Sequence, residues 1–165
     1  YKSVDQLPPF DDYAMAGRTY RYFSGEVLYP FGFGLSYTTF DYTDLSLSHD
    51  RLGGPEIVRV SCEVKNTGAV TGDEVVQVYL RDDESAYPVP RHSLVGFKRV
   101  RLAPGASVRV IFEIQPKQLA CVDETGRWLI EPGTFTVFIS GGQPGEAQGL
   151  SAQLKAGGKA IMLDE

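Results

Sequence analysis

Hydrophobic and polar residues alternate through three stretches of this 165-residue chain, at 57–65, 74–82 and 107–114. Because successive side chains of a β-strand point to opposite faces, this alternation predicts strands with one face in a core and one face in water. Each strand then needs a second layer to cover its apolar face, which predicts an antiparallel β-sandwich. The residues expected to face the core are Val58, Val60, Cys62, Val64, Val76, Val78, Leu80, Val108, Val110, Phe112, Ile114 and, from a later strand, Val137.

Turn residues separate the predicted strands at short intervals. Two Pro-Gly turns, at 103–106 and 131–134, are each expected to join the strands on either side as a hairpin. Short strands are expected around Gly157-Gly158 in the tail, and a single helical turn at 116–119. Seven or eight strands over roughly 120 residues are typical of an immunoglobulin-like or fibronectin type III-like β-sandwich.

The first 40 residues do not follow this pattern. They hold six of the nine tyrosines, among prolines and glycines that interrupt any simple period. Such a segment cannot bury its rings in a helix or strand of its own, so we expect it to cross the surface of another part and to pack its aromatic side chains there. The predicted fold class is therefore all-β, with an extended, irregular aromatic N-terminal segment.

Composition and charge restrict the classes of function. The chain is about one domain long, and its 42% hydrophobic content suits a folded core. The 16 basic and 21 acidic residues give a net charge of −5, without a dense basic stripe, so we expect no nucleic-acid partner. No apolar run approaches the ~18–20 residues of a membrane helix, so we expect no membrane partner.

The two cysteines are expected to be structural. Cys62 and Cys121 lie outside any CxxC or CxxH spacing, which favours two buried free thiols over a metal or redox site. The one asparagine, Asn66, is not in an N-x-[ST] sequence and so gives no evidence of glycosylation. The chain begins at Tyr1 without a signal-like start, so we expect it to be a piece of a longer protein.

Several motifs together resemble the carboxyl-terminal part of glycoside hydrolase family 3 enzymes. The most specific is YPFGFGLSYT at 29–38, which follows GRTYRYF at 17–23. The other motifs are GDEVVQVY at 72–79, LVGFKRV at 94–100, LAPG at 102–105, and Trp128 followed by EPG at 131–133. The resemblance implies that residues 1–40 are the end of an α/β sandwich domain and a linker, and that residues 41–165 are a fibronectin type III-like β-sandwich.

The resemblance also implies a role in a larger enzyme. The family hydrolyses terminal β-glucosides and β-xylosides with two carboxylates, one a nucleophile and one an acid/base. The resemblance assigns both carboxylates to other domains, so no catalytic residue, cofactor or metal is expected in this chain. It implies a non-catalytic accessory module that stabilises the catalytic domains of the same parent chain and shapes the pocket rim. The resemblance also implies that the module meets β-linked oligosaccharide through the parent enzyme, in the periplasm or outside the cell.

Two other classes of function are compatible with the fold. An independent carbohydrate-binding module would need an exposed planar strip of aromatic side chains, and the candidates lie mostly in residues 1–40. A cell-surface adhesion sandwich is allowed because sandwiches host many functions. The YPFGFGLSY stretch favours the accessory module over both.

The polar candidates for chemistry have simpler interpretations. Asp11 and Asp12 are adjacent, so in an extended segment they point apart and are expected to form a solvated turn. The run at 82–84, Asp-Asp-Glu, lacks the ligand spacing and the glycine of a calcium loop. His49 and His92 are expected in loops at the surface.

The connection at 82–93 is long for a loop between strands, and long ordered loops are often functional. If it covers the parent enzyme's pocket, Tyr87 could stack on a sugar or aglycone and Arg91 could bond its hydroxyls. The competing interpretation is structural contact with the neighbouring domain. The same two interpretations apply to Arg18, Tyr20, Arg21 and Tyr22, because guanidinium and phenol groups suit both sugar contacts and domain interfaces. Domain contact is the expected role of these four residues and of Tyr29, Phe31 and Phe33.

Overall fold

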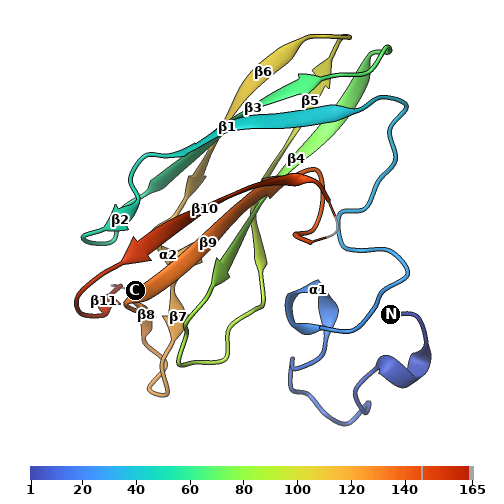
Figure 1. Cartoon of the computed structure of the whole chain (residues 1–165). Coiled ribbons are helices and arrows are strands. Elements are labelled where there is room, and N and C mark those ends of the chain that lie inside the picture. The colour runs from blue at the N-terminus through green and yellow to red at the C-terminus, as the bar shows by residue number, and fades with distance from the viewer. Residues whose placement is uncertain (146, 164–165) are drawn as a thin grey trace.

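Two β-sheets pack face to face in the computed structural model, which describes residues 1–145 and 147–163 (Figure 1). One sheet has the strand order β1-β3-β6 and the other has the order β2-β10-β9-β4-β5. Neighbouring strands pair antiparallel, except for the parallel pair of β10 and β2. The strands are β1 (Phe40–Leu47), β2 (Arg51–Leu52), β3 (Val58–Asn66), β4 (Gly72–Asp82), β5 (Ser93–Leu102), β6 (Ser107–Ile114), β9 (Gly133–Ser140) and β10 (Gly149–Ala156).

A small third sheet lies at one end of the sandwich, with the order β11-β8-β7. Its strands are β7 (Cys121–Val122), β8 (Trp128–Ile130) and β11 (Ile161–Met162). The helices are short: a 3₁₀ turn at Val4–Gln6, α1 (Thr19–Tyr22) and α2 (Pro116–Leu119). The predicted all-β fold, the sandwich and the helical turn at 116–119 are therefore confirmed.

The core between the two large sheets includes most of the residues that the alternation predicted, together with others such as Ile139 and Leu154. Val58, Val60, Cys62 and Val64 of β3 have no exposed surface, and Val78 and Val137 of the opposite sheet are equally buried. Phe112 packs against this core but remains partly exposed. A Cβ on Gly96 would lie only 3.0 Å from the Phe112 ring, so the strand β5 needs a glycine where the ring crosses it.

The two Pro-Gly turns do not form the hairpins that the sequence predicted. The turn at 103–106 forms, with Gly105 at a φ of 74° and Ala106 N donating to Ala103 O at 3.0 Å. It nevertheless carries the chain from β5, which pairs with β4, to β6, which pairs with β3 in the opposite sheet. The segment at 131–134 likewise connects β8 to β9 in a different sheet. The prediction was wrong because a tight turn reverses the chain without deciding which sheet receives the next strand.

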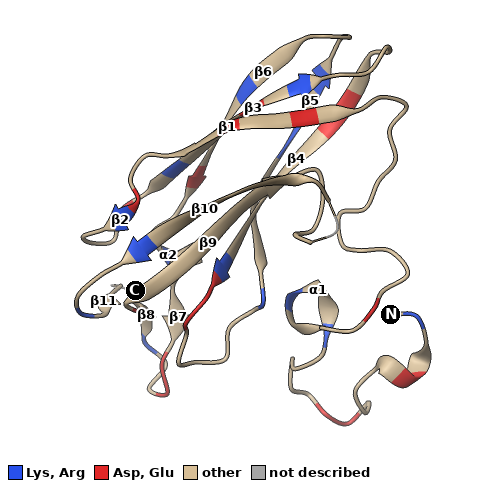
Figure 2. Ribbon diagram, viewed as in Figure 1, with Lys and Arg blue, Asp and Glu red and all other residues tan. Residues whose placement is uncertain are grey.

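Both cysteines are buried and free, as expected. Among the described residues, no helix is long and apolar enough to cross a bilayer. Basic and acidic residues are interspersed along the strands in Figure 2, and several pair across neighbouring strands. Arg99 and Arg101 of β5 both contact Asp73 of β4, at 2.6 and 3.2 Å.

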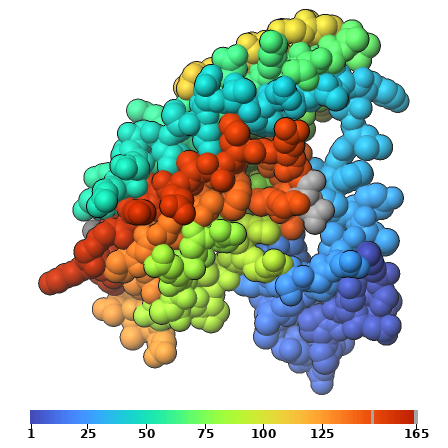
Figure 3. Space-filling model, viewed as in Figure 1, coloured from blue at the N-terminus to red at the C-terminus, as the bar shows by residue number. Residues whose placement is uncertain are grey.

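The N-terminal segment forms a lobe beside the sandwich (Figure 3). Its residues 1–39 contain the two helical turns before α2 and no strand. The segment lies against the end of the sandwich at which β4 meets the 82–93 loop (Figure 1). The candidate site described below lies at this contact.

Candidate interface and ligand cavity

Tyr20 of α1 fixes the N-terminal segment to the sandwich. Its ring stacks on Phe31 with 4.0 Å between centroids, and its edge meets Tyr79 of β4 at 6.3 Å. Its hydroxyl accepts a hydrogen bond of 3.2 Å from the backbone N–H of Leu94. The first residues of β5 are thereby held by a side chain that lies far away in the sequence.

Arg21 and Arg91 strengthen the same contact through the backbone. The Arg91 N–H donates to the Arg21 carbonyl at 2.7 Å, and the Arg91 guanidinium donates to the Phe23 carbonyl at 2.7 Å. The Arg21 guanidinium donates in turn to the Ser93 hydroxyl at 3.1 Å. The segment and the loop therefore hold each other by three direct hydrogen bonds.

Gly32 and Gln77 provide the second attachment. The Gln77 amide donates to the Gly32 carbonyl at 3.4 Å and to the Gly141 carbonyl at 3.0 Å. Gly32 has a φ of 78°, and a Cβ there would lie 2.3 Å from the Gln77 amide oxygen, so only glycine fits. The Phe31 N–H also donates to the Gln143 side chain at 3.1 Å.

These attachments bury β4 on both faces, which the alternation did not predict. Tyr79 is fully buried and Gln77 is 5% exposed, although both lie on the face away from the main core. The near-continuous apolar run VVQVYL at 75–80 was the available signal, because such runs are typical of strands covered on both sides.

The predicted contact residues divide into three groups. Tyr20, Arg21 and Phe31 touch the sandwich or its loops, as described above. Arg18 stays within the segment and donates to the carbonyls of Pro9 and Ala14, each at 3.0 Å. Tyr22 is half-buried, whereas Tyr29 is 71% exposed and Phe33 51% exposed.

An apolar groove runs along the boundary of the segment and β4. Its apolar lining residues are Phe31, Phe33, Leu35, Val75, Leu94 and Phe97, around a volume of about 440 Å³. Leu35 is 91% exposed and Phe97 is 70% exposed. We call this feature the apolar groove, and it is unusual because soluble domains seldom expose so many large apolar side chains together.

Tyr87 lies in the middle of the 82–93 loop, and Arg91 lies near its C-terminal end. Near Tyr87, the Ser85 hydroxyl and the Ala86 N–H both donate to the Glu131 carboxylate, at 2.6 and 3.2 Å. Arg91 lines a second cavity, of about 800 Å³, under the N-terminal segment, and Tyr87 does not. The structure therefore does not bring the two side chains into one cavity.

His92 is buried, contrary to the expectation that it lies at the surface. It is 8% exposed and packs against Tyr79 and Tyr20, with ring centroids 5.9 and 6.2 Å away. Its Nε2 atom is buried without a hydrogen-bond partner in the part of the chain that the structure describes. Burial, and secondarily the positive charges of Arg91 and Arg81, lower the pKa of His92. The expectation was wrong because the covering residue, Tyr20, belongs to another segment.

The acidic candidates lie on turns. Asp12 N donates to Pro9 O at 3.1 Å, and the Asp12 carboxylate accepts from Ala14 N at 2.9 Å, so Asp11 and Asp12 form an exposed turn. Asp83 pairs with Arg81 and accepts from the Thr136 hydroxyl at 2.6 Å. Within residues 1–145 and 147–163, no three histidine, cysteine or acidic side chains group as metal ligands would.

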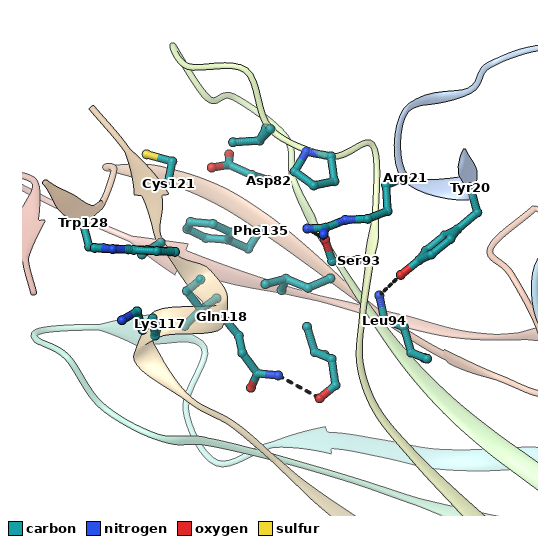
Figure 4. Close-up of a pocket in the computed structure, with 16 residues that line it drawn as sticks. Tyr20, Arg21, Asp82, Ser93, Leu94, Lys117, Gln118, Cys121, Trp128 and Phe135 are labelled. Atoms are coloured by element: carbon teal, nitrogen blue, oxygen red, sulfur yellow. Dashed lines mark hydrogen bonds between the residues drawn. The ribbon is translucent and has the colours of Figure 1, made fainter. Parts of the chain in front are cut away.

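A smaller cavity of about 290 Å³ lies between the sandwich and the small third sheet (Figure 4). Asp82 of β4, Phe135 of β9 and Trp128 of β8 line it, as do residues 93–95 of β5. Val89 and Pro90 of the 82–93 loop also line it, and Tyr20 and Arg21 of α1 reach its end. The 82–93 loop therefore covers this smaller cavity, but with Val89 and Pro90 and not with Tyr87 or Arg91.

The molecule described so far is an antiparallel β-sandwich with an aromatic segment docked on one sheet. Residues 74–143 match the family model described as a fibronectin type III-like domain. The chain is 43% identical over 120 residues to a β-xylosidase of Formosa agariphila, which covers 73% of this chain and 17% of that protein. It is 40% identical to a β-glucosidase of Bacteroides ovatus, over 68% of this chain and 15% of that protein.

Solved structures agree with these matches. The β-glucosidase of Listeria innocua superposes with a TM-score of 0.74 at 30% identity, over 81% of this chain and 18% of that one. These matches confirm the resemblance found in the sequence: the chain is a fibronectin type III-like region of glycoside hydrolase family 3. It spans less than a fifth of the length of either relative and of the Listeria innocua β-glucosidase.

Proposed function

We propose that the chain is the non-catalytic C-terminal module of a β-glucosidase or β-xylosidase and that it stabilises the catalytic domains of the same parent chain. In this proposal residues 1–40 are the end of the preceding domain and its linker, and residues 41–165 are the accessory sandwich. The β-linked oligosaccharide is a substrate of the parent enzyme. The relatives' names and the small part of their length that this chain spans support the proposal.

One observation carries the docking role. The apolar groove exposes Phe33, Leu35 and Phe97, at 51%, 91% and 70%, on a chain whose main core is otherwise well covered. Burying apolar surface stabilises by about 25 cal/mol per Å², so leaving these side chains in water forgoes stabilisation. The groove also joins the segment and the sandwich, the two parts that a preceding domain would have to contact. We infer that the parent's remaining domains cover it.

The test compares the same substitutions in two contexts. Leu35→Ser with Phe97→Ser should not lower the unfolding stability of the isolated chain, because both side chains already lie in water. In the full-length parent protein the pair should lower the temperature of half-inactivation by several degrees. Ile111→Ser, at a 58% exposed position of the other large sheet, is the control and should change neither. Equal half-inactivation temperatures for the parent protein and for its variant with Leu35→Ser and Phe97→Ser would refute the docking role.

The non-catalytic part of the proposal has its own assay. The isolated chain should not release nitrophenol from aryl β-glucosides or β-xylosides above the buffer rate. The opposite result would be turnover that disappears when Asp11 or Asp12 is replaced, since these are the adjacent carboxylates of the aromatic segment. That result would make the chain itself a catalyst.

We also propose that the 82–93 loop borders the parent's pocket, with Tyr87 and Arg91 at its rim. The engagement of Arg91 with the N-terminal segment supports a bordering role, because it ties the loop to the part nearest the preceding domain. Tyr87→Ala in the parent should then raise KM for an aryl glycoside and leave the unfolding midpoint unchanged. An unchanged KM would remove Tyr87 from the rim.

A further inference from the structure

The cavity in Figure 4 is built mainly by the sandwich itself. Five strands, namely β4, β5, β7, β8 and β9, contribute to its wall together with α2, and the 82–93 loop covers it. Its volume of about 290 Å³ lies at the small end of the ~300–1,000 Å³ range of ligand pockets. A single six-membered ring with its substituents is the size of ligand that such a cavity holds.

Its polar side chains include both donors and acceptors. Asp82 supplies a carboxylate, whose Oδ1 accepts from the Glu84 N–H at 3.1 Å. Burial, together with the charges of Glu131, Asp83 and Glu84, raises the pKa of Asp82, so the carboxylate lies in a poorly solvated place. Ser93 supplies a hydroxyl that already accepts from Arg21, and the Arg21 guanidinium has further N–H groups.

Aromatic rings form part of its apolar surface, beside aliphatic side chains. Trp128 and Phe135 line the cavity, and Figure 4 shows Phe135 between Trp128 and Arg21 in that view. The Lys117 ammonium lies 4.7 Å from the centroid of the Trp128 ring, which holds the indole in position. The cavity therefore offers rings for C–H surfaces as well as polar groups for hydroxyls.

The charges decide the class of ligand. An anion would meet the Asp82 carboxylate, and a cation would meet Arg21 and Lys117. A neutral polyhydroxylated ring satisfies both kinds of group, because each hydroxyl donates and accepts. We propose that this cavity binds one neutral pyranose monosaccharide, with its C–H face on the aromatic rings and its hydroxyls bonded to Asp82, Ser93 and Arg21. This site shares only Leu94 with the apolar groove and does not depend on the docking role.

Trp128 provides the fluorescence signal. It is the chain's single tryptophan, and it lines both this cavity and a neighbouring one beside Pro55 and Met162. Residues 93–95 line only this one of the two cavities, so their NMR signals identify the site. Titration with D-glucose and D-xylose should give a saturable change up to roughly 100 mM, well above a millimolar dissociation constant. Amide NMR signals of residues 93–95 and 117–121 should shift in the same titration.

Matched variants separate binding in the cavity from general effects. Asp82→Ala should weaken binding roughly tenfold or more, since it removes hydrogen bonds to a charged group. Asp83→Ala is the control, because Asp83 bonds Thr136 and does not line the cavity. Arg21→Met provides a second variant that leaves the sandwich intact, and it should weaken binding as well.

Several results would overturn the proposal. They are the absence of a saturable change with either sugar, tighter binding of glucuronate or glucosamine than of glucose, and equal affinities for Asp82→Ala, Arg21→Met and the unchanged chain. Shifts confined to residues outside 93–95 and 117–121 would move the sugar to another surface and would also refute it. None of these results bears on the docking experiment above.

Discussion

Phe112 illustrates what a single core side chain contributes. It packs on the core cluster and against Gly96, although its edge reaches the surface. Phe112→Ala should reduce the free energy of unfolding by about 3 kcal/mol, the lower end of the range for phenylalanine, because the ring is only partly buried. Urea unfolding measures this change.

Arg109, in the same strand β6, supplies the control. Arg109 is exposed on the outer face of β6, where it donates to the Ser61 hydroxyl at 3.2 Å. Arg109→Ala should cost no more than about 0.5 kcal/mol. Similar costs for the two substitutions would contradict the assignment of the core face.

His92 makes stability depend on pH. Its pKa is lowered in the folded chain, chiefly by burial, whereas the unfolded chain keeps the ordinary value of 6.5. As the pH falls below about 6.5 the unfolded state binds a proton that the folded state resists, so stability is lost by at most about 1.4 kcal/mol per pH unit. Unfolding in urea at pH 7.5 and at pH 5.5 should show this loss.

The comparison variant is His92→Gln, which keeps a polar side chain without a titrating imidazole. Its stability should fall less than that of the unchanged chain over the same interval. Equal losses would mean that groups other than His92 set the pH dependence between 7.5 and 5.5.

At the scale of elements, the N-terminal segment combines two parts with different attachment. Residues 20–32 bond to β4, β5 and the loops, whereas the hydrogen bonds of residues 1–16 run to partners within residues 1–26. Local structure held only by itself opens easily. We therefore expect little protection from hydrogen exchange over residues 1–16 and strong protection at the Leu94 amide.

Tyr20→Phe tests the attachment with little change in ring packing. It removes the hydroxyl that accepts from Leu94 N–H, so exchange at Leu94 should accelerate roughly tenfold, equivalent to about 1.4 kcal/mol. Exchange in the middle of β3 should stay the same. Strong protection throughout residues 1–16 of a monomer would instead place that part in the domain's own core and would count against an interface role.

At the scale of the whole molecule, the exposed aromatic and aliphatic side chains should make the isolated chain prone to bind other apolar surfaces. The apolar groove should bind a hydrophobic dye and promote self-association at high concentration. Leu35→Ser with Phe97→Ser should reduce both, as followed by dye fluorescence and light scattering. The Ile111→Ser control should change neither dye binding nor self-association. Equal dye binding by the unchanged chain and by the variant with Leu35→Ser and Phe97→Ser would contradict this expectation.

The sequence alone determined the local pattern of the sandwich. The alternation at 57–65 decided which side chains of β3 are buried, since a strand turns every second residue to the same face. The same argument predicted the positions of β4 and β6, and a separate expectation of a single helical turn at 116–119 matches α2. The family motifs, above all YPFGFGLSYT, indicated the resemblance to glycoside hydrolase family 3, and the relatives confirm this resemblance. These features depend on residues close together in the chain.

Only the tertiary structure decided how these elements combine. The Pro-Gly turns predicted hairpins, yet their strands lie in different sheets, because burying two apolar faces against each other outweighs pairing neighbours in sequence. Asn66 comes directly after the first predicted strand, and the fold buries its amide as a donor to the carbonyls of Val70 and Leu102. His92 is buried by Tyr20, and the cavity beside Trp128 has walls from seven helices and strands. Local periodicity contains no information about such partners, since their proximity arises only when distant segments pack together.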